Sequence, residues 1–151
     1  MEFYNPIREL EWLYGEWNGK ISLDGIEQEG FLSIKQIGSQ VVEFDLNILN
    51  SKTRTNYEKC TLVYDRTLEI CKAISSNHEG YIEFSEVTIR NRTKHTELES
   101  NFLSGINLPP NIKIQKKWTF YKNPKHLIYE VKMGQEGKIV VSAEFDFIKN
   151  F

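Results

Sequence analysis

The feature that most constrains the fold is an alternation of apolar and polar residues along almost the whole chain of 151 residues. Its period of two is typical of β-strands with one buried face. Segments rich in Gly, Asn, Asp, Pro or Ser interrupt the alternation, and Asp24–Gly25 is a tight hairpin signal. The pattern predicts strands at residues 16–24, 27–37, 40–50, 54–64, 68–76, 80–90, 94–104, 111–122, 126–134 and 138–149.

Consecutive strands with short connections predict an antiparallel meander. An open sheet of this length exposes two unpaired edges, and closure into an up-and-down barrel removes them. A β-sandwich is the alternative architecture. We therefore predict an all-β fold, an antiparallel up-and-down β-barrel of about ten strands, with residues 1–151 as one domain.

One segment before the first strand has helical spacing. Apolar residues recur between Pro6 and Tyr14, Asn5 is suited to the N-cap, and Gly15 is a natural stop. So short a helix is marginal alone, so we expect its apolar side to pack against the barrel.

Composition excludes several classes of function. The formal net charge is -2, which gives no reason to expect nucleic acid as a partner. No apolar run approaches the roughly 20 residues of a membrane span. MEFYNPIREL lacks a basic segment followed by an apolar one, so we expect no secretory signal. Two cysteines, Cys60 and Cys71, fit a reducing compartment and are expected on one face of neighbouring strands. We expect a cytoplasmic monomer or homodimer without a metal or cofactor.

A motif at the start of the first strand resembles that of a known superfamily. Leu13-Tyr-Gly15-Glu-Trp17 is similar to the Leu-x-Gly-x-Trp motif of the calycins, which include lipocalins and fatty-acid-binding proteins. The longer segment LEWLYGEWNGKISLDG resembles nitrobindin-like haem barrels and bacterial barrels of unknown function. The resemblance implies that Trp17 closes one barrel end beside the short helix. Lipocalins place an arginine over this tryptophan, where this chain has Lys149 nearby.

The nitrobindin resemblance also raises haem as a ligand. That family carries its proximal histidine in the last strand, and KIVVSAEFDFIKN contains none. His126 matches the preceding strand, and His78 and His95 fall in expected turns. Haem binding is therefore kept as an alternative.

Alternation predicts one inward-facing apolar set for each strand. The expected inward residues are Val42, Phe44, Leu46, Ile48, Leu62, Tyr64, Ile82, Phe84, Leu98, Phe102, Ile112, Ile114, Trp118, Phe120, Leu127, Tyr129, Val131, Met133, Ala143, Phe145 and Phe147. Lys72, Glu86, Lys116 and, more mildly, Ser100 interrupt these sets. Such charges either anchor a ligand head group, or lie at the rim, or are paired, as Lys72 and Glu86 would be across one hairpin.

The leading hypothesis is non-catalytic binding of a small apolar or amphipathic molecule inside the barrel. Lys72 and Lys116 would favour an anionic ligand. The expected ligand-binding residues are Phe44, Leu46, Leu62, Tyr64, Lys72, Glu86, Ser100, Phe102, Lys116, Trp118, Tyr129 and Phe145. One alternative is an isomerase or hydrolase that uses Glu86, Tyr64 or Lys116 as acid or base. Another is a filled barrel that acts only as an interaction module.

Overall fold

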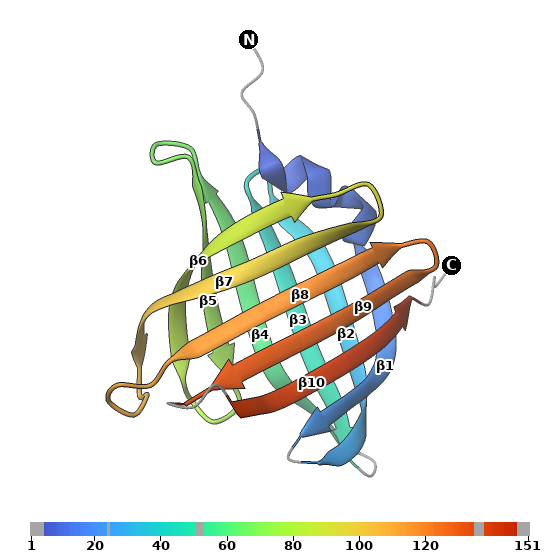
Figure 1. Cartoon of the computed structure of the whole chain (residues 1–151), viewed down its shortest axis with the longest axis vertical. Coiled ribbons are helices and arrows are strands. Elements are labelled where there is room, and N and C mark those ends of the chain that lie inside the picture. Colours follow the sequence, from blue (N-terminus) through green and yellow to red (C-terminus); the bar gives the residue numbers. More distant parts are fainter. Residues whose placement is uncertain (1–4, 24, 51–52, 135–137, 148–151) are drawn as a thin grey trace.

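The computed structural model describes residues 5–23, 25–50, 53–134 and 138–147. A short 3₁₀ helix, η1 (Pro6–Leu13), precedes the strands and lies across one end of them (Figure 1). The strands are β1 (Gly15–Leu23), β2 (Ile26–Gly38), β3 (Val41–Asn50), β4 (Thr53–Asp65), β5 (Ile70–Asn77), β6 (Ile82–Asn91), β7 (His95–Ile106), β8 (Ile114–Lys122), β9 (Lys125–Met133) and β10 (Lys138–Phe147).

Each strand pairs antiparallel with the next one along the chain. The register between β1 and β10 runs from Trp17 opposite Phe147 to Leu23 opposite Val141, so the sheet curls round until its first and last strands meet. The predicted all-β antiparallel up-and-down sheet with one short helix is confirmed, and the predicted strand limits lie within a few residues of the observed ones.

The interior of the sheet is packed with large side chains. Trp17, Phe120, Tyr129 and Phe145 are completely buried. The backbone of β2 comes close to Phe145, because a Cβ atom at Gly30 would lie 3.0 Å from its ring. The expected inward residues Ala143 and Phe147 fall outside the side chains that the structure describes.

The helix η1 is fastened to the sheet by both of its ends. At the first end, Asn5 donates from Nδ2 to the carbonyl oxygen of Ser39, in the turn between β2 and β3, at 3.1 Å. The same side chain accepts a hydrogen bond from the backbone N–H of Ile7 at 3.0 Å, which satisfies a free N–H of the first turn. At the other end, Trp17 Nε1 donates to the carbonyl oxygen of Leu13 at 3.0 Å. The indole of Trp17 also meets the edge of the Phe120 ring, with 5.6 Å between centroids. Trp17 therefore lies beneath the helix, and Lys149 is outside the described residues.

The expected orientation of β5 is wrong. The inward residues of this strand are Cys71, Ala73 and Ser75, whereas Ile74 is 47% exposed. Lys72 lies on the outer face and forms an ion pair with Asp65 at 3.3 Å. The reason is the register of the β4–β5 hairpin, which sets Cys71 directly opposite the inward-facing Tyr64.

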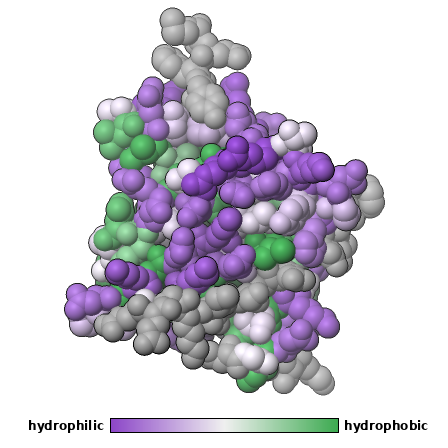
Figure 2. Space-filling model, viewed as in Figure 1, coloured by the Kyte–Doolittle hydropathy of each residue, from purple (hydrophilic) through white to green (hydrophobic). Residues whose placement is uncertain are grey.

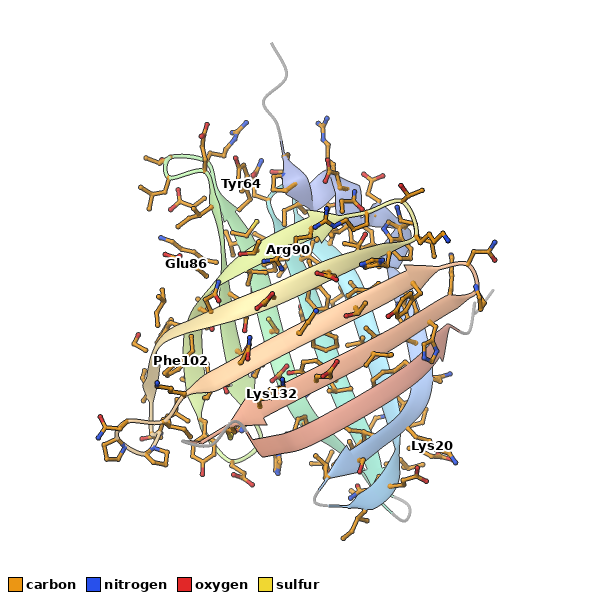
Figure 3. All side chains as sticks on the ribbon, in the orientation of Figure 1. Lys20, Tyr64, Glu86, Arg90, Phe102 and Lys132 are labelled. Atoms are coloured by element: carbon orange, nitrogen blue, oxygen red, sulfur yellow. The ribbon has the colours of Figure 1, made fainter. Side chains whose placement is uncertain are left out.

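The expected inward face of β6 is wrong in the same way. Glu83 and Ser85 are buried, whereas Ile82, Phe84 and Glu86 belong to the outer face. Figure 3 shows Glu86 projecting away from the strands. Lys72 and Glu86 are opposite one another in the register, as expected for neighbours, but the ion pair of Lys72 is made with Asp65.

The two cysteines share the inner side of β4 and β5 without being adjacent. Cys60 is opposite Ser75, and Cys71 is opposite Tyr64. Both are free thiols. Desolvation raises the pKa of Cys60 to about 12 and that of Cys71 to about 11, so both are protonated at neutral pH.

The pairing of β5 with β6 ends early at the helix end of the sheet. Its last pair is Cys71 with Val87, but β6 continues to Asn91 and pairs there with β7. Residues 88–91 thus pair with β7 along one edge, and within the described part of the chain no strand pairs with their other edge, on the side of β5. The outcome is an opening in the wall beside β6.

The face seen in Figure 2 is largely hydrophilic and carries small, separate hydrophobic patches. Among the described residues, no helix has the length and apolar character needed to cross a membrane.

Candidate binding site

A cluster of charged side chains lies inside the sheet. The ammonium group of Lys116 on β8 contacts Glu58 of β4 and lies 2.6 Å from Oε2 of Glu83 on β6. Tyr129 of β9 donates its hydroxyl to Oε1 of Glu58 at 2.8 Å. We call these four residues the Lys116 cluster. Every member is less than a tenth exposed, so the cluster joins four strands through the interior.

The local sequence explains why a lysine can point inward here. Lys116 alternates with Ile114 and Trp118, so the pleat of β8 directs it into the core. Small inward residues on β5 and β6, Ala73, Ser75 and Ser85, leave space for its long side chain. The neighbouring ring of Trp118 stacks on Tyr129 with centroids 3.6 Å apart and planes 8° from parallel.

The electrostatics of the Lys116 cluster are unbalanced. With all charged groups ionised, two carboxylates face one ammonium, so the cluster carries a net charge of −1. Burial raises the pKa of Glu83; Lys116 opposes this shift and Glu58 adds to it. Burial alone would lower the pKa of Lys116, but the two carboxylates outweigh it and the pKa lies above its ordinary value. Lys116 is therefore a fixed cation whose charge is already satisfied.

An enclosed void adjoins the cluster. Its volume of about 20 Å³ is sufficient for about one water molecule. The residues around it are Phe44, Glu58, Cys60, Leu62, Ala73, Ser75, Ser85, Val87, Leu98, Ser100, Lys116 and Trp118. This void is therefore too small for an organic ligand.

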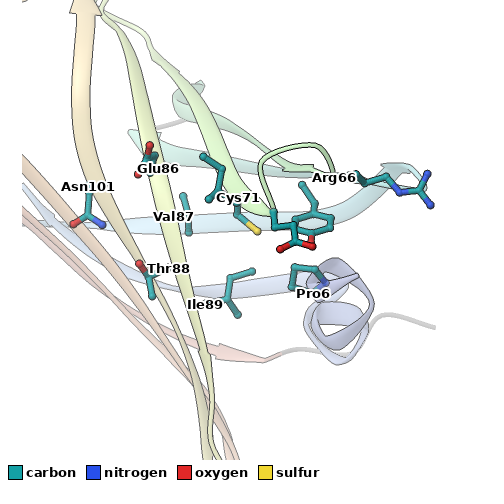
Figure 4. Close-up of a pocket in the computed structure, with 11 residues that line it drawn as sticks. Pro6, Arg66, Cys71, Glu86, Val87, Thr88, Ile89 and Asn101 are labelled. Carbon is teal, nitrogen blue, oxygen red and sulfur yellow. The ribbon is translucent and has the colours of Figure 1, made fainter. Parts of the chain in front are cut away.

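A larger hollow lies where β5 and β6 separate. It has a volume of about 520 Å³, within the range of small-molecule sites. We call it the β5–β6 hollow; its lining residues are Pro6, Tyr64, Arg66, Glu69, Ile70, Cys71, Glu86, Val87, Thr88, Ile89 and Asn101. Figure 4 shows Pro6, Cys71, Val87 and Ile89 around one opening between β6 and η1. Val87 also borders the enclosed void, so the hollow leads towards the Lys116 cluster.

A second open hollow, of about 500 Å³, lies where β8 begins. Ser100, Phe102, Ile114 and Met133 contribute to its wall. Lysines at 113 and 132 also line it. The walls of the two hollows share Asn101 of β7.

The structure divides the expected ligand-binding residues among several places. Phe44, Leu62, Ser100, Lys116 and Trp118 surround the enclosed void. Tyr64 and Glu86 line the β5–β6 hollow, Glu86 from the outer face, and Phe102 lines the second hollow. Leu46, Tyr129 and Phe145 are fully buried core residues. Lys72 is outside the interior, so its expected role there is wrong.

Sequence reasoning missed the two carboxylates of the cluster. Glu58 has the same parity as Cys60, Leu62 and Tyr64, so the alternation of β4 already indicated an inward glutamate. Glu83 has the parity of Val87 and Ile89, but Ile82 and Phe84 gave the opposite phase of β6 a stronger apolar signal.

None of the three histidines is a member of the Lys116 cluster. His78 follows β5 in a turn, and His95 begins β7, where Nε2 is 3.1 Å from Glu97. His126 neighbours the inward residue Leu127 and so belongs to the outer side of β9. Among the residues that the structure describes, no group of three or more His, Cys, Asp or Glu side chains is arranged to hold a metal ion.

Comparison with known structures identifies a similar fold. The crystal structure of Rv2717c from M. tuberculosis has a TM-score of 0.74 to this chain and covers 98% of it and 100% of its own length. The sequence identity is 16%, so this likeness concerns the fold alone. No protein-family model matches the chain, and no curated protein matches it significantly.

Proposed function

We propose that this protein binds a small apolar or amphipathic molecule, without catalysis, in the β5–β6 hollow. The observation that supports this proposal is the hollow of about 520 Å³. It opens beside the part of β6 that does not pair with β5, and Val87 lies between it and the enclosed void. In this proposal the ten strands act as a closed barrel of the calycin type, and the ligand enters through its wall beside η1.

The lining of the hollow supports this chemistry. Ile70, Val87, Ile89 and Pro6 offer apolar surface, and Tyr64 adds a ring with a hydroxyl group. Removing apolar ligand surface from water provides about 25 cal/mol per Å². Polar atoms of Thr88 and Asn101 at the margin are available to orient a head group. The enclosed void, at about 20 Å³, is too small for this role.

Binding of the uncharged fluorescent dye Nile red tests the proposal. The unchanged protein is expected to bind the dye and raise its fluorescence. Val87→Trp should abolish binding because the indole fills the hollow where it reaches the void. The matched control is Ile74→Trp, which places the same group on the exposed outer face of β5 and should leave binding unchanged. Urea unfolding of both variants verifies that each is folded.

The opposite result favours a filled barrel that acts through its surface. The observation behind this second candidate is the interior itself, whose enclosed void holds about one water molecule. Absence of Nile red binding, or equal binding by a folded Val87→Trp variant, would contradict a ligand site in the hollow.

A further inference from the structure

The ligand's charge follows from the groups around and behind the β5–β6 hollow. We propose that the hollow takes amphipathic molecules with a cationic head group, such as an alkyl amine, in preference to carboxylates. This inference rests on the proposed function and reverses the preference that the sequence suggested.

The first argument concerns Lys116, which seemed to be an anchor for an anion. Its ammonium is shared between Glu58 and Glu83, and its side chain is 7% exposed. A ligand carboxylate approaching Lys116 would meet two carboxylates already in place. Because the two carboxylates outnumber the one ammonium, the net interaction with a ligand carboxylate is repulsive, and the low dielectric constant of the interior strengthens it.

The second argument concerns the margin of the hollow. Its charged lining residues are Glu69, Glu86 and Arg66, two carboxylates and one guanidinium. Figure 4 shows the side chain of Arg66 extending away from Val87 and Ile89, towards the outside. Lys72, the other cation expected here, does not line the hollow and is engaged by Asp65. The surroundings of a bound molecule are thus negative on balance.

The third argument is that the net charge has the same sign at the margin of the hollow and in the Lys116 cluster behind it. The margin contributes a net charge of −1 from Arg66, Glu69 and Glu86. The Lys116 cluster behind Val87 contributes another −1 when ionised. A cationic head group is attracted from both sides, whereas its chain lies on the apolar lining.

Three ligands of equal chain length test this inference: decylamine, decanol and decanoate at pH 7, each displacing Nile red from the full chain. We expect decylamine to bind about tenfold more tightly than decanoate, with decanol between them. Equal or tighter binding of decanoate would overturn the inference and leave the proposed function intact. Failure of all three to bind, together with failure of Nile red, would overturn both.

Charge-removing variants locate the source of the preference. Glu86→Gln and Glu83→Gln preserve shape and should each reduce the preference for decylamine over decanoate by about threefold, without changing decanol binding. The control Glu27→Gln removes the same charge from an exposed position on β2 and should change none of the three affinities. An unaltered preference in both folded variants would contradict the assignment to these carboxylates.

Discussion

The ammonium of Lys116 lies 2.6 Å from Oε2 of Glu83, and these two residues come from strands that do not pair with each other. The contact crosses the interior from β8 to β6, and Glu58 of β4 joins it. The pair therefore links β6 and β8 across the intervening strand β7, and Glu58 extends this link to β4. Ionic contacts buried this deeply are costly to break on one side only, because the remaining charge stays without a partner.

Lys116→Met should destabilise the fold by about 3–5 kcal/mol, because it leaves Glu58 and Glu83 buried without a cation. The loss should be smaller at acidic pH, where Glu83, whose pKa is raised by burial, takes up a proton. Urea unfolding at several pH values measures both effects. Adding Glu58→Gln and Glu83→Gln to the same chain should restore much of the stability. A loss below about 1 kcal/mol for Lys116→Met would contradict the importance of the ion pairs.

The raised pKa of Glu83 predicts how the stability of the fold changes with pH. Its pKa in the folded state exceeds the unfolded value, so its stabilising contribution is present below the unfolded pKa and is lost as pH rises through the folded pKa. Glu83→Gln should remove this dependence, so the variant gains stability relative to the unchanged protein as pH rises above about 4.5. Urea unfolding between pH 4 and 8 provides the measurement.

Glu99 supplies a comparison of opposite sign. A hydrogen bond from Arg90, at 2.8 Å, holds the pKa of Glu99 below its usual range. Its contribution is therefore present above the unfolded pKa and lost as pH falls through the folded pKa. Glu99→Gln should be relatively most destabilising at neutral pH and least at acidic pH. The same trend for Glu83→Gln and Glu99→Gln would refute the assignment for Glu83.

Trp17→Ala should cost about 3–5 kcal/mol, as other truncations of large buried aromatic residues do. The indole is fully buried, donates to Leu13 and packs on Phe120, so its loss opens a cavity beneath η1. Thermal and urea unfolding measure the loss. The relative affinities for decylamine, decanol and decanoate should be preserved, because Trp17 does not line the β5–β6 hollow. A changed order of the three affinities would argue against a purely architectural role.

Gly105→Ala should destabilise the protein by about 1–3 kcal/mol, because the site has no space for a methyl group. A Cβ atom there would clash with the side chain of Leu108 and would lie 2.7 Å from the backbone oxygen of Ile82. Gly38→Ala is the matched control, since its nearest neighbour would be Val41 at 3.8 Å. Equal unfolding free energies for the two variants would contradict the close approach at Gly105.

The cysteines report on occupancy of the hollow. Cys71 lines it, whereas Cys60 borders only the enclosed void. Both thiols should react slowly with iodoacetamide, since desolvation raises their pKa values and the thiolate is the reactive form. Decylamine should slow the alkylation of Cys71 further and leave that of Cys60 unchanged. Peptide mapping by mass spectrometry distinguishes the two, and equal protection of both would argue against binding in the hollow.

Much of the fold was predictable because its signals are local. Turn chemistry and period-two alternation located the strands, and Asn5, Pro6 and Gly15 marked the limits of the helix. Lys116 is also predictable as an inward residue, because it alternates with the apolar residues Ile114 and Trp118 on β8. Each of these inferences depends on neighbours within a few residues.

The candidate site was less predictable, because which residues of β5 and β6 face inward depends on how these strands pair with their neighbours. On β5 and β6 the larger apolar residues Ile74, Ile82 and Phe84 are on the outer side, and small residues face inward. Hydrophobicity alone therefore selected the wrong face. The shared face of the cysteines, combined with inward Tyr64, already required Lys72 to point outward. The β5–β6 hollow itself depends on where the pairing stops, which no local pattern encodes.

The small inward residues Ala73, Ser75 and Ser85 have a consequence for how such a fold changes during evolution. They and the long side chain of Lys116 occupy complementary volumes around the same small void. Shortening the residue at position 116 would therefore empty a space the length of a lysine side chain while the opposite wall stayed unchanged. The size of this void is therefore set jointly by position 116 and by the three small residues on β5 and β6, and a change at any one of them alters the space between the strands.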